Sequence, residues 1–174
     1  SIRIPAAFCG LVGLKPTFGR VSETGTVPLC WSVAHVGPIG ATVRDVALGY
    51  GAIAGPDPTD PNSLGRPEMT LSGLGSLDLM GLRVGICKEW FEDADPAVVS
   101  RCRWLVDALI SAGAVEKDIE VPDIGQCKAS HLVIIAAEML EANRRQYRGQ
   151  RHQFGLDTRS NLAIAQSISG ADYI

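Results

Sequence analysis

The pattern that most constrains the fold is a strand, a helix and a second strand between residues 83 and 121. Residues 83–87, RVGIC, are a strand candidate, and Asp95 with Pro96 provides the start of a helix that ends near Gly113. Residues 116–121, EKDIEV, alternate as a second strand. A helix of about 17 residues between two strands is typical of a βαβ crossover, so we predict the α/β class. The apolar face of this helix is expected to hold Val98, Cys102, Leu105 and Leu109.

Three further helices are indicated by their start signals or apolar spacing. Thr42 and Asp45 form a capping-box pair that begins a helix, and Gly55 ends its pattern. A second helix is expected over residues 129–147, and a third begins near Asp157 or Thr158. The expected inward residues are Leu132, Ile135, Ala136, Met139 and Leu140 in the former and Leu162, Ile164, Ala165 and Ile168 in the latter.

The first forty residues predict a short helix, a short strand and a long loop. Pro5 suits the first turn of the helix and pushes Ile4 toward extended backbone, while Gly10 suits a left-handed stop. Ser1 is therefore expected on an extended lead-in. Residues 11–15 are a strand candidate, and a glycine-punctuated loop continues from there to residue 40.

Residues 55–76 separate the two halves of the chain. They are rich in Pro, Gly, Asp and Ser and show no period, which indicates a long surface connection.

Composition excludes several classes of protein. The chain has 46% hydrophobic and 20% charged residues and a net charge of -3, as in ordinary globular proteins, so we expect no nucleic-acid partner. The longest apolar run, residues 132–137, is far short of the ~20 residues of a membrane-spanning helix. The five cysteines form no C-x-x-C pair, which predicts reduced thiols in an intracellular protein with no metal site.

Residue types alone give only weak candidates for catalysis. Ser1 with His35 and Asp45 could be grouped as a triad, but the grouping rests on composition, and a structural role is the better prediction for His35, as for His131 and His152. Ser1 could also act as an N-terminal nucleophile with its own amino group as base. Lys15 borders a turn, where a lysine usually points into water.

A cysteine and a group of arginines complete the candidates. Cys9 has no base nearby in sequence, and we expect it to pack in a core. An anion site is a weak prediction for the arginines, since basic residues near a helix C-terminus are usually solvated; they are Arg144, Arg145, Arg148 and Arg151.

Three stretches of the first 63 residues resemble the second half of the signature of the amidase signature family. They are SIRIPAAFCGLVGLKPTFGRVS, SVAHVGPIGATVRDVALGYGAIAG and DPTDPNS. The resemblance implies an amidase signature fold, a mixed sheet with helices on both faces. It also implies one partial amidase domain over residues 1–174, truncated at both ends. Within it, residues 1–63 carry the signature, 64–81 connect, and 82–174 form the following strand-helix-strand-helix region.

The Ser-Ile-Arg at the start of the chain matches the family's nucleophile motif. The resemblance implies that Ser1 is the nucleophile that forms an acyl-enzyme, and that Arg3 binds substrate or supports the nucleophile, with a structural salt bridge as the alternative. The family's base, a lysine, its relay serine and its oxyanion-hole glycines would precede Ser1. No cofactor is implied, and the isolated chain is expected to be inactive.

The second half of the chain narrows the resemblance to one branch of the family. RVGICKEWFED and DTRSNLAIAQSISGADYI resemble plant-type fatty acid amide hydrolases, which implies a lipophilic amide such as an N-acylethanolamine as substrate. The alternatives are a general small or aryl amidase, a glutamyl-tRNA amidotransferase A-type subunit, and a catalytically dead fragment or paralogue that only binds. A homodimer, and peripheral membrane association through segments outside this chain, are further hypotheses.

Overall fold

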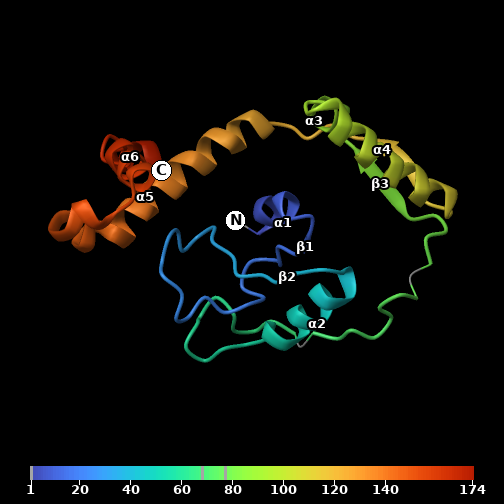
Figure 1. Cartoon of the computed structure of the whole chain (residues 1–174), viewed down its shortest axis with the longest axis horizontal. Helices are drawn as coiled ribbons and strands as arrows, with labels where there is room; N and C mark the ends of the chain where they lie inside the picture. Colours follow the sequence, from blue (N-terminus) through green and yellow to red (C-terminus); the bar gives the residue numbers. More distant parts are fainter. Residues whose placement is uncertain (1, 68, 77) are drawn as a thin grey trace. The chain divides into compact units, whose positions relative to one another are not determined.

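The computed structural model describes residues 2–67, 69–76 and 78–174, and it divides into two compact units (Figure 1). Unit 1 comprises Ser1–Ser72 and Lys128–Ile174, and unit 2 comprises Gly73–Cys127. Both units combine helices with a two-stranded ladder, one antiparallel and one parallel. The α/β class is therefore confirmed.

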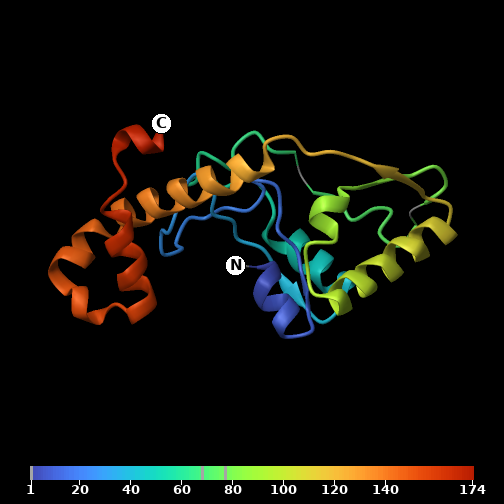
Figure 2. The same cartoon turned by 90° about the horizontal axis from the view of Figure 1, so that it is seen from above.

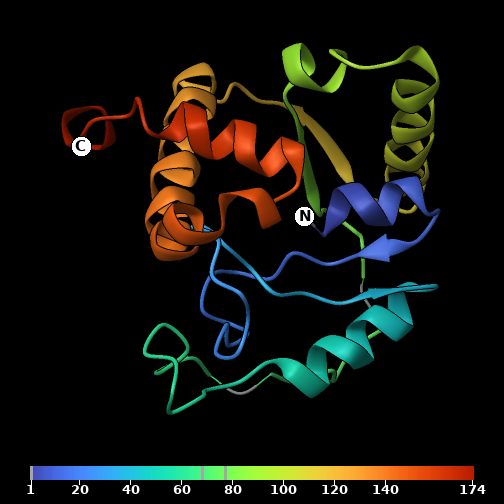
Figure 3. The ribbon, with the colours of Figure 1, turned by 60° about the vertical axis from the view of Figure 1, so that its left-hand side comes forward.

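Unit 1 begins with helix α1 (Arg3–Phe8) and the short strands β1 (Val12–Gly13) and β2 (Ile39–Gly40). The strands pair antiparallel, with Val12 opposite Gly40 and Gly13 opposite Ile39. Figure 3 shows α1 beside β1 and helix α2 beside β2. Strand β1 is shorter than the predicted residues 11–15, and β2 was not predicted, because two-residue strands are defined by their partner and leave no period in the sequence.

Of the two backbone predictions for this end of the chain, the one for Gly10 is confirmed and the one for Ile4 is wrong. Gly10 has φ +64°, so its left-handed conformation is confirmed. The extended backbone predicted for Ile4 is wrong, because Ile4 lies inside α1 and Pro5 occupies the third helical position. A proline in the first turn loses no helical hydrogen bond there, and this outweighs the preference of the residue before it.

Helix α2 (Val43–Ile53) begins at the predicted capping box. The Thr42 hydroxyl accepts a hydrogen bond from the Asp45 N–H at 3.1 Å, and the Asp45 carboxylate accepts one from the Thr42 N–H at 3.1 Å. Local side chains satisfy the free N–H groups of this helix end, which is why the sequence was enough to find it.

The stretch after α2 is more than the surface connection we predicted. Asp60 and Ser63 are buried, and the Ser63 hydroxyl accepts from the Asp57 N–H at 2.8 Å and donates to the Asp60 carbonyl at 2.9 Å. Asp57 also accepts a 2.7 Å hydrogen bond from Ser22, which lowers the pKa of the Asp57 carboxyl. Polar side chains thus fold residues 57–63 onto the loop before them.

The remainder of unit 1 is a helical hairpin followed by α7 (Gly170–Tyr173). The hairpin consists of α5 (Ile124–Gln150), which belongs to unit 1 from Lys128 onward, the 3-10 turn η1 (Arg151–Gln153) and α6 (Leu156–Ala165). Figure 2 shows α6 turning back along the end of α5. Met139, Tyr147 and Leu162 form its buried cluster, with Leu140 and Phe154 packed against them.

The inward faces of the hairpin were predicted only in part. Met139, Leu162 and Ala165 are buried as expected, but Leu132 is 69% exposed and Ile164 is 65% exposed. Helix α5 is also longer than predicted, since it begins at Ile124, just after Asp123 turns with φ +57°. Helix α6 is preceded by Gly155, which places Asp157 inside its first turn rather than at its cap.

Unit 2 contains the predicted crossover. Strand β3 (Arg83–Ile86) is followed by α3 (Lys88–Phe91), α4 (Pro96–Ser111) and β4 (Val115–Asp118), and β3 pairs parallel with β4. Asp95 caps α4 by accepting from the Ala97 N–H at 2.8 Å. The predicted strand 116–121 is therefore one residue late at its start and three residues long at its end.

The buried face of α4 is rotated by one position from the predicted one. Val106 is buried, and Val99, Arg103 and the predicted Leu109 are partly buried, whereas the predicted Val98 and Leu105 are more than half exposed. The reason is that Arg103 lies on the inner face, where its guanidinium pairs with the Glu116 carboxylate of β4. A satisfied ion pair replaces an apolar contact there, so hydrophobic spacing predicted Leu109 correctly and was wrong for Val98 and Leu105.

Candidate functional site

Ser1, the predicted nucleophile, lies outside the described residues, so the site is described from Ile2 onward. Ile2 is 8% exposed and Arg3 opens α1 with an exposed side chain. No ion pair to Arg3 is found among the described residues, so the predicted salt bridge receives no support there. A substrate-contacting role for Arg3 stays a prediction.

Ile2 packs against Gly13 and Gly37, whose lack of a side chain lets their backbones lie close to Ile2. A Cβ on Gly13 would lie 3.0 Å from the Ile2 carbonyl oxygen, and one on Gly37 would lie 2.7 Å from Ile2 Cδ1 and 2.2 Å from the Leu14 carbonyl oxygen. The Leu14 N–H donates to the Pro38 carbonyl at 3.1 Å, which ties the two sides together. Since Ile2 directly succeeds Ser1, this packing fixes the backbone on the C-terminal side of the predicted nucleophile.

The proposed grouping of His35 with Asp45 is not supported. The Asp45 carboxylate is occupied by Thr42 in the capping box. His35 Nδ1 lies 2.8 Å from the Val33 carbonyl, and its ring packs edge-on against Phe18 at 5.7 Å between centroids. His35 is thus a structural histidine, as expected.

An acid and a thiol precede His35 in the same loop, and both have shifted pKa values. Burial raises the pKa of the Glu23 carboxyl, and nearby His35 opposes this shift. Cys30 is buried, and its burial together with the charges of Glu138 and Glu23 raises the pKa of its thiol. A thiol with a raised pKa is held as the neutral, unreactive form.

Other candidates from the sequence have ordinary surroundings. The Lys15 ammonium donates to the Pro16 carbonyl at 2.5 Å from an exposed position. Cys9 is exposed, so the expectation that it packs in a core is wrong for this structure: it succeeds α1 on its outer side. The arginines of α5 and η1 are exposed as expected; Arg144 pairs with Glu141 and Arg151 stacks over the Tyr147 ring at 5.3 Å.

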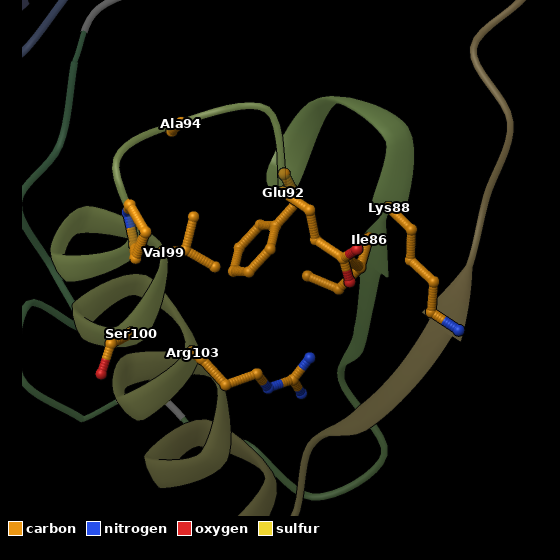
Figure 4. Close-up of a pocket in the computed structure, with 9 residues that line it drawn as sticks. Ile86, Lys88, Glu92, Ala94, Val99, Ser100 and Arg103 are labelled. Atoms are coloured by element: carbon orange, nitrogen blue, oxygen red, sulfur yellow. The ribbon is translucent and has the colours of Figure 1, made fainter.

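The hollow drawn in Figure 4 lies in unit 2, at the carboxyl end of β3, and measures 410 Å³. Carboxyl ends of parallel strands are where α/β proteins usually bind ligands. Apolar side chains line it together with Lys88, Glu92, Ser100 and Arg103. Both cations are already paired, Lys88 with Asp118 at 2.8 Å and Arg103 with Glu116.

The pKa values agree with this pairing. The hydrogen bond to Asp118 raises the pKa of Lys88, and the hydrogen bond from Arg103 lowers the pKa of Glu116. The hollow therefore offers apolar surface, two paired cations, the Glu92 carboxylate and the Ser100 hydroxyl, and among the described residues no hydrogen bond joins that hydroxyl to a base. It can hold an apolar group, but its residues supply no chemistry.

A fully buried acid that the sequence did not reveal lies on α5. Glu138 accepts hydrogen bonds from Ser32 and Tyr173, 106 and 35 residues away. The available signal was its position, three residues after Ile135 within the expected inward stripe of the helix. A carboxyl group at such a position needs hydrogen-bond partners.

Two kinds of site are absent from the part of the chain that the structure describes. Within residues 2–67, 69–76 and 78–174, no group of three or more His, Cys, Asp or Glu side chains is placed to hold a metal ion. In the same residues, no helix combines the length and apolar character that crossing a membrane requires.

Comparison with known proteins identifies the family. The family model described as Amidase matches residues 1–170. Fatty acid amide hydrolase of Oryza sativa subsp. japonica is 35% identical over 100% of the chain and 30% of its own length, and an amidase of Pseudomonas putida is 38% identical over 100% and 38%. The solved native peptide amidase of Stenotrophomonas maltophilia superposes with a TM-score of 0.76 at 27% identity, over 99% of this chain and 40% of that one.

The chain thus spans between 30% and 40% of the length of these relatives. The family model covers nearly all of the chain, and the rice and Pseudomonas proteins match it from end to end. This chain belongs to the amidase family.

Proposed function

We propose that the chain carries the nucleophile of a serine amidase, and that Ser1 is this nucleophile. The observation that carries the proposal is the match of the Amidase family model from residue 1 onward, together with the Ser-Ile-Arg motif at that point. The packing of Ile2 against Gly13 and Gly37 supports it, because a nucleophile needs a backbone held in one position.

The chemistry is determined by the needs of a serine nucleophile. Ser1 Oγ attacks the amide carbonyl carbon while its proton passes through a relay serine to a neutral lysine, both of which the resemblance places before Ser1. The tetrahedral oxyanion is held by backbone N–H groups, each worth on the order of 3 kcal/mol of barrier. The amine leaves with a proton, and water then cleaves the acyl-enzyme ester to the free acid. Without the preceding segments, the isolated 174-residue chain should not turn over.

We further propose a fatty acid amide, such as an N-acylethanolamine, as the substrate class, which makes a small lipophilic molecule the main partner. The support is the 35% identity to rice fatty acid amide hydrolase over the whole chain. A general amidase acting on small or aryl amides is the second candidate, because the Pseudomonas amidase is 38% identical over the same length.

A covalent probe tests the proposal. The protein expressed from its complete gene is treated with a fluorophosphonate, and the modified peptide is identified by mass spectrometry. We expect label on Ser1 and none in Ser1→Ala, with Ser160→Ala, an exposed serine on α6, as the matched control that still labels. A folded protein that does not label at Ser1 would instead support the inactive paralogue.

Substrate competition then separates the two candidates. Long-chain fatty amides should slow labelling of the active protein more than short aryl amides do. The reverse order would support the general amidase.

A further inference from the structure

Glu138 is a buried carboxylate that the proposed chemistry does not use. It is 1% exposed, and the ion pairs found among the described residues all involve other acids. Its oxygens accept hydrogen bonds from the Ser32 N–H at 3.0 Å, from the Ser32 hydroxyl at 2.5 Å and from the Tyr173 hydroxyl at 2.9 Å. Three neutral donors therefore compensate for burying this group.

Two of the three donors belong to one residue of the loop that leads to β2. Ser32 lies in a turn closed by the hydrogen bond from the Ala34 N–H to the Cys30 carbonyl at 2.8 Å, and Cys30 is buried beneath it. Figure 3 shows this part of the chain running from the side of α5 toward β2. Glu138 thus anchors the near end of the segment 30–38.

The far end of the same segment holds Ile2. Gly37 lies against Ile2 Cδ1 and the Leu14 carbonyl, and Pro38 accepts the hydrogen bond from the Leu14 N–H. A displacement of the segment would open this packing and release the residue next to Ser1. Glu138 contacts Ser32, the backbone of residues 33–36 connects Ser32 to Gly37, and Gly37 contacts Ile2.

We propose that Glu138 is a positioning residue for the nucleophile, acting through Ser32 to hold the segment 30–38 against Ile2. The proposal rests on the proposed role of Ser1. Tyr173 has a different part: its hydroxyl ties α7 to Glu138, and its contact does not lead to Ile2.

A pair of isosteric substitutions isolates the hydrogen bonds from the volume of the side chain. Glu138→Gln keeps an acceptor for the Ser32 N–H, whereas Glu138→Met fills the same space without one. In the protein from its complete gene, we expect Glu138→Met to slow fluorophosphonate labelling of Ser1 by about 10- to 100-fold, the scale of a misplaced reacting group. Glu138→Gln should retain most of the rate, and Glu141→Met, an exposed position on the same helix, should match wild type.

Kinetics on the amide substrate give a second readout. Because Glu138 would act on the geometry of the nucleophile and not on binding, kcat should fall in Glu138→Met while KM stays nearly constant. Wild-type labelling in a folded Glu138→Met protein, or equal losses in the Gln and Met variants, would overturn the proposal.

If Glu138→Met does not fold, two milder variants test whether Glu138 acts through Ser32. Ser32→Ala removes one donor from an exposed residue and should slow labelling several-fold, while Tyr173→Phe should leave it unchanged. Equal losses in both, or no loss in either, would refute a route through Ser32.

Hydrogen exchange tests the anchoring role of Glu138 and Ser32 separately from the proposed role of Ser1. Backbone amides of residues 30–37 should exchange faster in Ser32→Ala than in wild type, whether or not Ser1 is reactive. A wild-type protein that never labels refutes the nucleophile, whereas unchanged exchange refutes the anchor.

Discussion

Gly37 offers the sharpest test of how the segment after the nucleophile is held. In Gly37→Ala the new Cβ would stand 2.2 Å from the Leu14 carbonyl oxygen and 2.7 Å from Ile2 Cδ1. Real Cβ atoms essentially never come within 3.0 Å of a heavy atom, so the Leu14 backbone and the Gly37 backbone must separate by at least 0.8 Å. The Ile2 side chain can rotate away, but the carbonyl of Leu14 cannot.

The cost of this shift has two parts. Overpacking at a closely packed position costs about 1–3 kcal/mol, and weakening the adjacent hydrogen bond from Leu14 to Pro38 adds about 0.5–1.5 kcal/mol. We therefore expect about 3 kcal/mol of destabilisation, the middle of the summed range. A displacement near 1 Å next to the nucleophile should also slow labelling of Ser1 by up to about 100-fold.

Urea unfolding of the complete protein, monitored by circular dichroism, measures the first effect, and the rate of fluorophosphonate labelling measures the second. Gly149→Ala is the matched control, because Gly149 lies in α5 with nothing within 4 Å of the added Cβ. It should stabilise by up to about 1 kcal/mol. A Gly37→Ala protein with an unchanged midpoint and unchanged labelling would refute the close approach of these backbones.

Three further predictions concern stability. Arg103 lowers the pKa of Glu116 below its usual 4.5, so the pair stabilises the fold above pH 4.5 and this contribution is lost as the pH falls through the folded-state pKa. As the pH is lowered from about 6 to about 3, the melting temperature should therefore fall more steeply in wild type than in Glu116→Gln. Equal slopes in the two proteins would contradict the pairing. Leu162→Ala, at a fully buried position, should lower the free energy of unfolding in urea by about 2–5 kcal/mol. The exposed Ile164→Ala should lower it by at most about 0.5 kcal/mol, and similar losses in the two variants would contradict the assigned face of α6. Thr42→Ala removes the cap of α2 and should cost about 1 kcal/mol, measured the same way, and no loss would contradict the capping box.

Signals confined to a few neighbouring residues predicted the structure well. The starts of α2 and α4 were found because Thr42 and Asp95 satisfy free N–H groups one turn away. The order strand, helix, strand was likewise enough to predict the parallel pair β3 and β4. In each case the physical cause lies within one continuous stretch of the sequence.

Faces of helices were predicted less well, because the partner of a side chain is not local. Arg103 lies on the inner face of α4 since its partner Glu116 lies on β4, thirteen residues on. Leu132 was assigned inward by its spacing, yet the described residues leave it exposed. The spacing of apolar residues predicts that a segment is helical, whereas the contacts with other elements determine which face of the helix is buried.

The residues of the candidate site also differ in how far the sequence alone could predict them. Ser1 and Arg3 were selected through a family resemblance, and their roles stay predictions. Glu138 could not be selected by a motif, since its partners Ser32 and Tyr173 come from distant parts of the sequence. What the sequence did offer was an acid within an apolar stripe, where burial requires compensating donors.

The two glycines beside Ile2 show why such a site is hard to infer from sequence. Gly10 and Gly25 have positive φ angles and nothing within 4 Å of an added Cβ, so they serve as turn residues, which sequence reasoning anticipates. Gly13 and Gly37 have no such angle and are small because a neighbouring backbone lies where a side chain would be. The residue type is the same in both cases, but the second requirement is set by residues up to 35 positions away, from Ile2 to Gly37. Substitution by alanine separates them: a turn glycine resists it by backbone strain, and a contact glycine resists it by displacing the residue next to Ser1.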